Sequence, residues 1–250
     1  MNSIKRTILN IFYLMPWKLW GPCYTLLFGE RKDLHKFRKS RTGKRTYIDP
    51  SVRILGWENV VIGDNTVLSE DVWLNINHRK EGHTRIIIGN NCHIGIRNFF
   101  SSGPLISIKD YCFTGIDCHF LGCGHIIESP FVPYIASGLT EGAKIEIGVN
   151  CWLTTSVTVH QGVSIGHGSI IGARSVVHES IPPFSIAVGN PCKVIKRFDL
   201  EKMKWIDAKN WTDGQESMIP TENEYKEILK EEYQDISPAI ISTGKRFGWL

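Results

Sequence analysis

Aliphatic residues return at every sixth position through the second half of this 250-residue chain. The uninterrupted series is Ile147, Leu153, Val159, Ile165, Ile171 and Val177. Small or β-branched residues follow the first five of these after four positions, at Cys151, Val157, Val163, Ser169 and Ser175. An α-helix requires a period of 3.6 and an ordinary strand a period of two, so neither explains this pattern. Hexapeptide periodicity is typical of parallel β-helices, in which each short strand ends in a tight turn.

The same period recurs upstream, with interruptions. It includes Ile62, Leu68 and Leu74, then Ile88, Ile94 and Phe100, and then Ile108, Thr114 and Phe120. The interruptions fall at residues 75–85, 101–107 and 121–144. Loops that leave a regular solenoid usually lie on one face, which is often the functional one. We therefore predict an all-β domain of parallel β-helix over residues 46–198, with functional side chains in its interruptions.

The N-terminal segment differs in composition from the rest of the chain. Residues 7–27 are apolar and aromatic but are interrupted by prolines, and residues 1–45 carry 11 Lys/Arg against 2 Asp/Glu, a net of 11 − 2 = +9. The segment contains no apolar run of about 18 residues, so we expect no transmembrane helix. It also contains no small-residue cleavage site, so we expect no signal peptide. Residues 7–45 either pack on the body of the protein or lie in a membrane interface. We expect no nucleic-acid binding, because no reading motif accompanies the charge.

The repeat stops after Ser180, and helical patterns follow at residues 199–211 and 222–233. We therefore divide the chain into an amphipathic, basic segment (1–45), the β-helix (46–198) and a short helical extension with a tail (199–250). Seven cysteines without a CxxC pair predict neither a disulfide framework nor a zinc knuckle, and they indicate a reducing compartment. Four of them occupy small core positions of the repeat: Cys92, Cys112, Cys118 and Cys151.

The repeat from Ile147 to Val177, followed by GARSVVHESIPPFSIAVGNPCKVIKR, resembles the end of the coil in the hexapeptide-repeat acyltransferases. The resemblance is greatest to the sugar O-acetyltransferases, of the galactoside, maltose and polysaccharide types, and it covers residues 46–198. It implies a left-handed parallel β-helix, a homotrimer, and acetyl-CoA bound between neighbouring subunits. It also implies acetyl transfer to a hydroxyl of a carbohydrate or glycan precursor, in the synthesis of a surface polysaccharide such as O-antigen or capsule. The expected location is the cytoplasm, with peripheral contact to the inner face of the membrane if residues 7–45 bind lipid.

The family's catalytic residue is a histidine in a loop after a repeat of the form IGDNxxI. The stretch IKDYCFTGIDCHFLGCGH (108–125) aligns with it without a gap and ends on His125. A thioester is already activated, so the acceptor hydroxyl needs only to lose its proton as it attacks. Imidazole suits that task because its ordinary pKa lies near ambient pH. The resemblance therefore implies that His125 is the general base of a direct transfer.

The resemblance also assigns residues to coenzyme A and requires no metal. The cofactor-binding candidates are Trp152, Thr155, Ala173, Lys193, Lys196 and Arg197. The chain departs from the family at Thr154 and Arg174, which replace glycines, and at His178-Glu179, which replaces a Thr-Lys pair. The candidates for binding the acceptor are the interruption at residues 75–85, with Asn75, Asn77 and His78, and in addition Asn98.

Other functions remain open at this point. An N-acetyltransferase for an amino sugar or an antibiotic has the same fold, so an amine acceptor is the main alternative. The γ-class carbonic anhydrases are β-helices that bind zinc through three histidines, and His93, His119 and His125 imitate that set, although the last two are six rather than five apart. A Cys123–His125 acyl-enzyme route is also conceivable. A non-enzymatic scaffold is the third class, and binding of coenzyme A distinguishes it from an acyltransferase.

Overall fold

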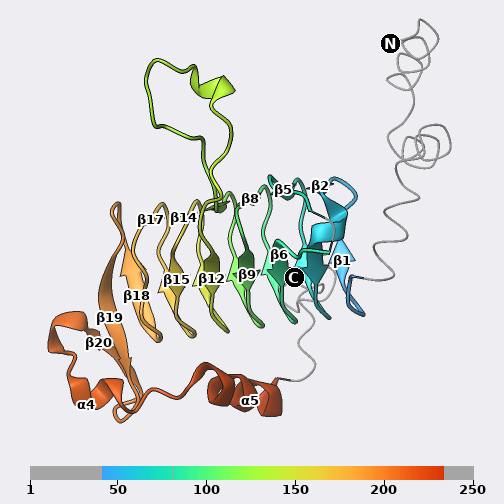
Figure 1. Cartoon of the computed structure of the whole chain (residues 1–250). Helices are drawn as coiled ribbons and strands as arrows, with labels where there is room; N and C mark the ends of the chain where they lie inside the picture. Colours follow the sequence, from blue (N-terminus) through green and yellow to red (C-terminus); the bar gives the residue numbers. More distant parts are fainter. Residues whose placement is uncertain (1–40, 81, 234–250) are drawn as a thin grey trace, which may run out of the picture. The chain divides into compact units, whose positions relative to one another are not determined.

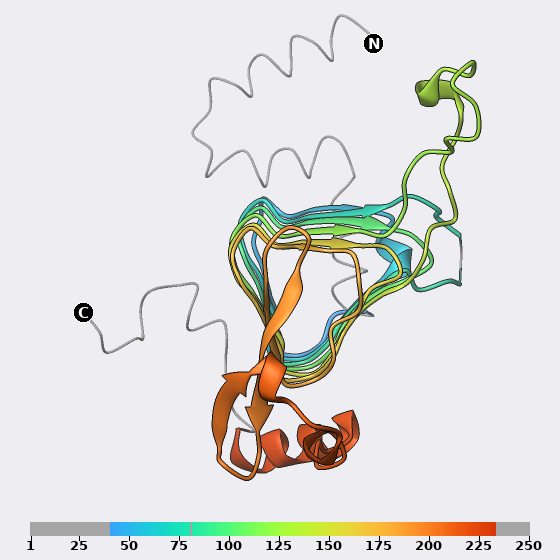
Figure 2. The same ribbon diagram turned by 90° about the vertical axis from the view of Figure 1, so that its left-hand side faces the viewer.

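The computed structural model of the chain describes residues 41–80 and 82–233. Most of these residues form a stack of coils made of short strands (Figure 1). Viewed along the stack, each coil is a triangle with one strand on each side (Figure 2). Almost all of the predicted N-terminal segment lies outside the described residues. Among the described residues, no helix is long and apolar enough to cross a membrane.

The three sides of the triangle are parallel sheets, here called A, B and C. The described chain begins with β1 in sheet B and β2 in sheet C, and each later coil passes from A to B to C. Sheet A consists of β3 (Val60–Ile62), β6 (Ile86–Ile88), β9 (Ile106–Ile108), β12 (Ile145–Ile147) and β15 (Ser164–Ile165). Sheet B consists of β1 (Tyr47–Ile48), β4 (Val67–Leu68), β7 (His93–Ile94), β10 (Phe113–Thr114), β13 (Trp152–Leu153), β16 (Ile170–Ile171) and β18 (Ser185–Val188), followed by the antiparallel β19 (Lys193–Asp199) and β20 (Lys204–Asp207). Sheet C consists of β2 (Arg53–Leu55), β5 (Trp73–Ile76), β8 (Phe99–Ser102), β11 (His119–Leu121), β14 (Thr158–His160) and β17 (Val176–Val177).

The core is a set of columns made by the repeat. Every repeat residue in the four series given above is buried, including Thr114. Phe100 and Phe120 stack with their ring centroids 4.4 Å apart. The four cysteines at small positions are also buried, which confirms them as small core residues. The hexapeptide period therefore predicted the core correctly.

Corner A–B, where each coil passes from sheet A to sheet B, is held by a ladder of side chains. The Asn90 side chain accepts a hydrogen bond from the backbone N–H of Asp64 at 2.7 Å, and Asp110 accepts one from Asn90 at 2.8 Å. The next coil has Val149 at this position, whose side chain has no acceptor, so the ladder of side chains ends at Asp110. The backbone N–H of Val149 donates to the carboxylate of Glu222, the first residue of α5 (Glu222–Glu232), at 3.0 Å. The helix α5 is therefore bonded to this corner beyond the end of the ladder and covers it.

The C-terminal extension corrects one prediction. Residues 199–211 were expected to be helical, but they form the turn after β19, the strand β20 and a short 3-10 helix, η3 (Ala208–Asn210). Asp199 holds the turn by accepting hydrogen bonds from the N–H groups of Glu201 and Lys202, and Phe198 packs on Trp205 across the two strands. These contacts between strands outweigh the local helical pattern. Only α4 (Asp213–Glu216) and α5 are α-helices among the described residues of this extension.

Candidate active site

The longest interruption of the repeat projects from corner C–A, where each coil passes from sheet C back to sheet A (Figures 1 and 2). Its two arms run antiparallel, and we call residues 122–126 and 138–144 the stalk. The Thr140 N–H donates to the Gly124 carbonyl at 2.8 Å, and the Ile126 N–H donates to the Gly138 carbonyl at 3.2 Å. A Cβ at Gly142 would collide with the carbonyl oxygen of Gly122, so glycine allows the arms to approach closely.

His125 lies in the first arm of this stalk. It forms an isolated antiparallel bridge with Leu139 in the second arm, and its side chain is exposed. Beyond the stalk the loop is apolar and exposed, with Phe131 at 95% and Ile135 at 89% of their full accessible area. The histidine predicted to be the base is therefore available to a ligand and stands on a projection rather than in the wall of the β-helix.

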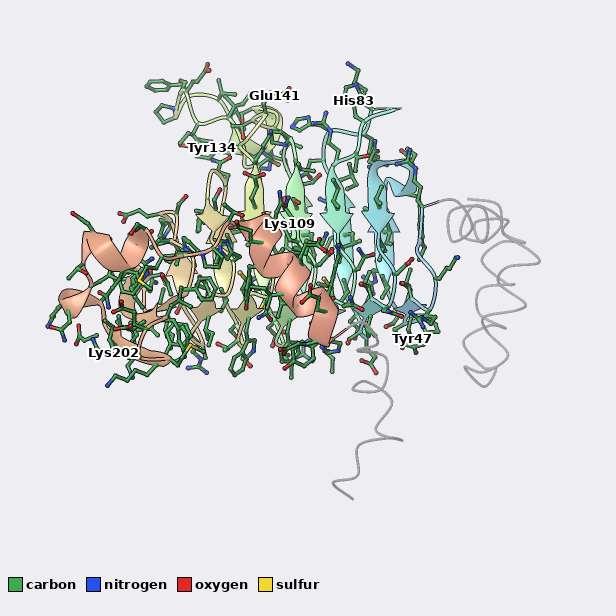
Figure 3. The ribbon with its side chains drawn as sticks, turned by 90° about the horizontal axis from the view of Figure 1, so that it is seen from below. Tyr47, His83, Lys109, Tyr134, Glu141 and Lys202 are labelled. Carbon is green, nitrogen blue, oxygen red and sulfur yellow. The ribbon has the colours of Figure 1, made fainter. Side chains whose placement is uncertain are left out.

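The root of the stalk contacts another interruption of the repeat. It was predicted at residues 75–85, but β5 continues to Ile76, so the interruption itself is residues 77–85. The Asn77 amide donates to the Cys123 thiol sulfur at 2.9 Å and to the Ser101 hydroxyl at 2.9 Å. His78 Nε2 lies 2.8 Å from the Thr140 carbonyl oxygen, on the second arm. Figure 3 shows His83, from residues 77–85, and Tyr134 and Glu141, from the longest interruption, along the same edge of the β-helix. The prediction that the interruptions share one face is confirmed, because all of them lie at corner C–A.

Cys123 is half-buried at this root, two residues before His125. Burial raises the pKa of its thiol, although hydrogen bonds involving Ser101 and Asn77 act in the opposite direction. A thiol with a raised pKa is a poor nucleophile near neutral pH, because the thiolate is the reactive form. The environment of Cys123 therefore disfavours the acyl-enzyme route.

Three of the cofactor-binding candidates lie on sheet B and at corner B–C. Trp152 points outward from β13 and stacks on Phe113, with ring centroids 6.2 Å apart. Thr155 and Ala173 occupy equivalent positions in successive coils, since the N–H of Arg174 donates to the Thr155 carbonyl at 2.9 Å. All three candidate side chains are exposed. All three predicted positions are therefore accessible to a ligand.

The three basic candidates differ in their environment. Lys193 and Lys196 are exposed on β19, and Lys193 forms an ion pair with Glu179 at 2.9 Å. Arg197 is buried, bonds to the Glu216 carboxylate at 2.9 Å and lies 4.2 Å from the centroid of a Trp211 ring. The two lysines are accessible to a phosphate, whereas Arg197 holds the C-terminal extension onto the coil.

The acceptor candidates Asn75 and Asn98 both have structural partners. Asn98 is fully buried at corner B–C, where its amide donates to the carbonyls of Gly95 and Gly115 at 2.9 and 2.7 Å. Asn75 is half-buried and donates to the Asn77 side chain at 2.7 Å. Asn98 therefore fixes the turn of its coil, and Asn75 belongs to the network at the root of the stalk.

The three histidines of the carbonic anhydrase alternative lie on three different parts of the β-helix. His93 is on sheet B, 3.0 Å from the Ser69 hydroxyl, and burial lowers its pKa. His119 points outward from sheet C, and His125 is on the stalk. Across residues 41–80 and 82–233, no group of three or more His, Cys, Asp or Glu residues is arranged to hold a metal ion.

Two histidines beside the stalk were not among the predicted site residues. His160 and His178 lie on successive coils at corner C–A, with their ring centroids 4.1 Å apart. Burial, followed by the charge of His178, lowers the pKa of His160. His160 is in register with Leu121, the last residue before the stalk. The repeat contains the signal for both, since each directly follows a core valine, Val159 or Val177.

Comparison with known proteins gives the chain its family. No family model matches it. A protein of Escherichia coli (strain K12), named as the colanic acid biosynthesis acetyltransferase WcaF, is 32% identical over 177 residues, which cover 71% of this chain and 79% of the relative. The galactoside O-acetyltransferase of the same organism is 34% identical over 122 residues, 44% of this chain. That match covers 56% of the relative, and the chain spans about half the length of several other curated relatives that it matches.

A solved structure supports the fold. The N-acyltransferase AntD of Bacillus cereus, in a complex with dTDP-4-amino-4,6-dideoxyglucose and coenzyme A, superposes with a TM-score of 0.56. The match covers 67% of this chain and 88% of the AntD chain, at 21% sequence identity. The stacked coils and the 32% sequence identity to WcaF lead to one conclusion: the chain belongs to the hexapeptide-repeat acyltransferases and has their left-handed parallel β-helix.

Proposed function

We propose that this chain is an acetyl-CoA-dependent O-acetyltransferase that acts on a hydroxyl of a carbohydrate or glycan precursor. The observation that carries the proposal is the exposed His125 on the stalk, at the position that the family resemblance gives to the catalytic histidine. The names of the galactoside and colanic acid relatives support a sugar as the acceptor, and the second name supports surface polysaccharide synthesis.

In this proposal His125 acts as the general base. Acetyl-CoA supplies an activated thioester carbonyl. The His125 imidazole accepts the proton of the acceptor hydroxyl as that oxygen forms the new C–O bond, and the proton passes to the thiolate that leaves when the C–S bond breaks. Base catalysis of this kind contributes roughly 10²–10⁴-fold. Trp152, Thr155 and Ala173 bind the slender arm of coenzyme A, while Lys193 and Lys196 contact its phosphates.

The proposed site takes residues from two copies of the chain. Within one copy, His125 stands at corner C–A and Thr155 and Ala173 at corner B–C, with sheet C between them. A homotrimer, in which the stalk of one copy reaches the cofactor-binding face of the next, brings them together. The exposed apolar residues beyond the stalk, such as Phe131 and Ile135, support this arrangement because burial against a partner removes them from water.

The proposed location is the cytoplasm, where acetyl-CoA is made available to the site. Residues 7–45 supply either a packed helix or a peripheral membrane contact. Sedimentation with anionic vesicles, compared between the full chain and a variant without residues 1–40, distinguishes these two roles. Equal sedimentation of the two proteins contradicts the membrane contact.

The first test is a calorimetric titration of the purified chain with coenzyme A in metal-free buffer. Micromolar binding at about one site per chain supports the acyltransferase, and a screen of acceptors with acetyl-CoA then compares hydroxyl sugars with amino sugars. Acetylation of an amine alone would replace the O-acetyltransferase with the N-acetyltransferase alternative. Absence of coenzyme A binding would contradict the proposal and favour a scaffold.

A further inference from the structure

We propose that His78 and Asn77 are positioning residues, which clamp the two arms of the stalk and so set the place of His125. Neither residue has a role in the function proposed above, on which this inference rests. The two side chains belong to the interruption at residues 77–85, and both precede the stalk by more than forty residues in the sequence. Each holds a different arm, and each contact lies within two residues of His125 or of Leu139, which faces it.

The stalk has few internal bonds. Its arms are joined by the backbone hydrogen bonds of Ile126, Thr140 and Ala143, by the Thr140 hydroxyl bonded to Gly124, and by the single bridge at His125. A two-stranded ribbon of this kind is only marginally stable in water by itself. Contacts from the body of the β-helix therefore decide how well the position of His125 is defined.

Asn77 connects the first arm to the coils beneath it. Its amide nitrogen donates to the Cys123 sulfur, to the Ser101 hydroxyl and to the Ser102 carbonyl, at 2.9, 2.9 and 3.0 Å. Its oxygen accepts from the Asn75 amide at 2.7 Å. Both ends of this side chain are thus bonded, which fixes its orientation and places its donor against the stalk.

His78 connects the second arm. A carbonyl oxygen only accepts hydrogen bonds, so the 2.8 Å contact with Thr140 requires the proton on Nε2 of His78. Thr140 directly follows Leu139, the residue opposite His125. The imidazole therefore acts here as a neutral or charged donor, and no proton transfer is needed for the clamp to work.

These contacts argue against a direct role of Asn77 and His78 in binding the acceptor. A side chain that binds an acceptor sugar needs free donors or acceptors, but the Asn77 groups and the His78 Nε2 are already used within the chain. Their effect on transfer is therefore indirect. A misplacement of about 1 Å at a reacting group can reduce turnover about 100-fold. Loss of the clamp can therefore have a measurable effect on turnover.

The test compares three single variants of the full chain: His78→Ala, His78→Gln and His83→Ala. Alanine removes the donor, whereas the glutamine amide keeps a donor that can reach Thr140. His83 is an exposed histidine on the same interruption and serves as the matched control. The readouts are kcat and KM for acetyl-CoA, together with hydrogen exchange of the stalk amides at Ile126 and Thr140. Exchange reports on the clamp whether or not the protein transfers acetyl groups.

We expect His78→Ala to lower kcat about 10- to 100-fold, while KM for acetyl-CoA stays within about twofold. Exchange of the stalk amides should rise about 2- to 10-fold, in proportion to one lost hydrogen bond. His78→Gln should recover most of both effects, and His83→Ala should change neither. Asn77→Asp, which keeps the acceptor but loses the donor to Cys123, should resemble His78→Ala.

Unchanged stalk exchange in His78→Ala overturns the clamp. An equal loss of kcat in His78→Gln and His78→Ala also overturns the clamp. That result would mean that His78 takes part in the chemistry, where an amide cannot replace the imidazole. A third outcome is that the wild type shows no acetyl transfer while the stalk amides of His78→Ala exchange faster than those of the wild type. This outcome supports the clamp and refutes the proposed function, so the two failures are distinguishable.

Discussion

Two corners of the same coils are built in opposite ways. At corner A–B the turns are short, the side chains of Asn90 and Asp110 bond to the backbone of the preceding coil, and α5 covers the outside. At corner C–A the turns lengthen into interruptions, and one of them carries an exposed histidine. Corner A–B uses similar hydrogen bonds in successive coils, while corner C–A is interrupted three times, within residues 75–85, 101–107 and 121–144.

The difference shows how one repeat can serve stability and chemistry together. The repeat needs only its inward positions and one regular corner to stack, so the chain at corner C–A is free to vary. Glu222 illustrates the constraint on the regular side, because the N–H of buried Val149 finds its acceptor on a helix that is distant in the sequence. The stalk illustrates the freedom on the other side, where bonds between two interruptions replace the ladder. The following substitutions test this division.

The largest expected effect is on activity and falls at corner C–A. His125→Ala should reduce kcat for acetyl transfer about 10²- to 10⁴-fold, because the acceptor hydroxyl loses its base. Binding of coenzyme A should be unchanged, since the candidates that bind it lie on sheet B and at corner B–C. Steady-state kinetics with acetyl-CoA and calorimetry with coenzyme A measure the two quantities. Near-normal turnover in this variant would remove His125 from the mechanism.

The second effect is on stability and falls in the core, which both corners share. Phe120→Ala should lower the free energy of unfolding by about 3–5 kcal/mol, because it leaves a cavity beside the stacked ring of Phe100. Phe113→Ala is the matched control, since that ring points outward and is 39% exposed. Urea unfolding of both variants gives the comparison. Equal losses would show that the column of inward residues is not the main source of stability.

The core was predictable from the sequence because each inward position repeats with the same period, and one buried residue predicts the next. His125 was found through the family resemblance and not through the period. The contacts of Asn77 and His78 with the stalk were not predictable, because they join two interruptions of irregular length. The same reason explains the error at residues 199–211, where the packing of Phe198 on Trp205 across two strands replaced a local helical pattern. The burial of Arg197 likewise depends on Glu216 and Trp211.

A third substitution tests the regular corner. Glu222→Ala should destabilise the fold by about 1–3 kcal/mol, because it leaves the N–H of buried Val149 without an acceptor. Glu227→Ala on the same helix should cost at most about 0.5 kcal/mol, since its partner Lys230 is also on the exposed surface. Thermal unfolding measures both losses. If corner A–B only supports the fold, acetyl transfer by the folded Glu222→Ala protein should equal that of the wild type, and a loss of kcat would contradict the division between corners.

The smallest effect depends on pH and concerns the ion pair between Asp110 and Lys226, whose charged atoms are 2.7 Å apart. Burial raises the pKa of Asp110, but the bonds from Lys226 and from the Asn90 N–H outweigh it, and the pKa lies below its usual value. A lowered pKa stabilises the fold above the unfolded value of about 3.9, and this stabilisation is lost as the pH falls through the lower folded value. Lys226→Met should therefore cost about 1 kcal/mol at pH 7 and progressively less below about pH 4. Lys209→Met, on the exposed surface of η3, is the control and should show no such trend. Urea unfolding between pH 3 and pH 7 provides the measurement. If the stability lost in Lys226→Met stays constant over this range, α5 is held at corner A–B by packing and by the Glu222 hydrogen bond, without help from this charge pair.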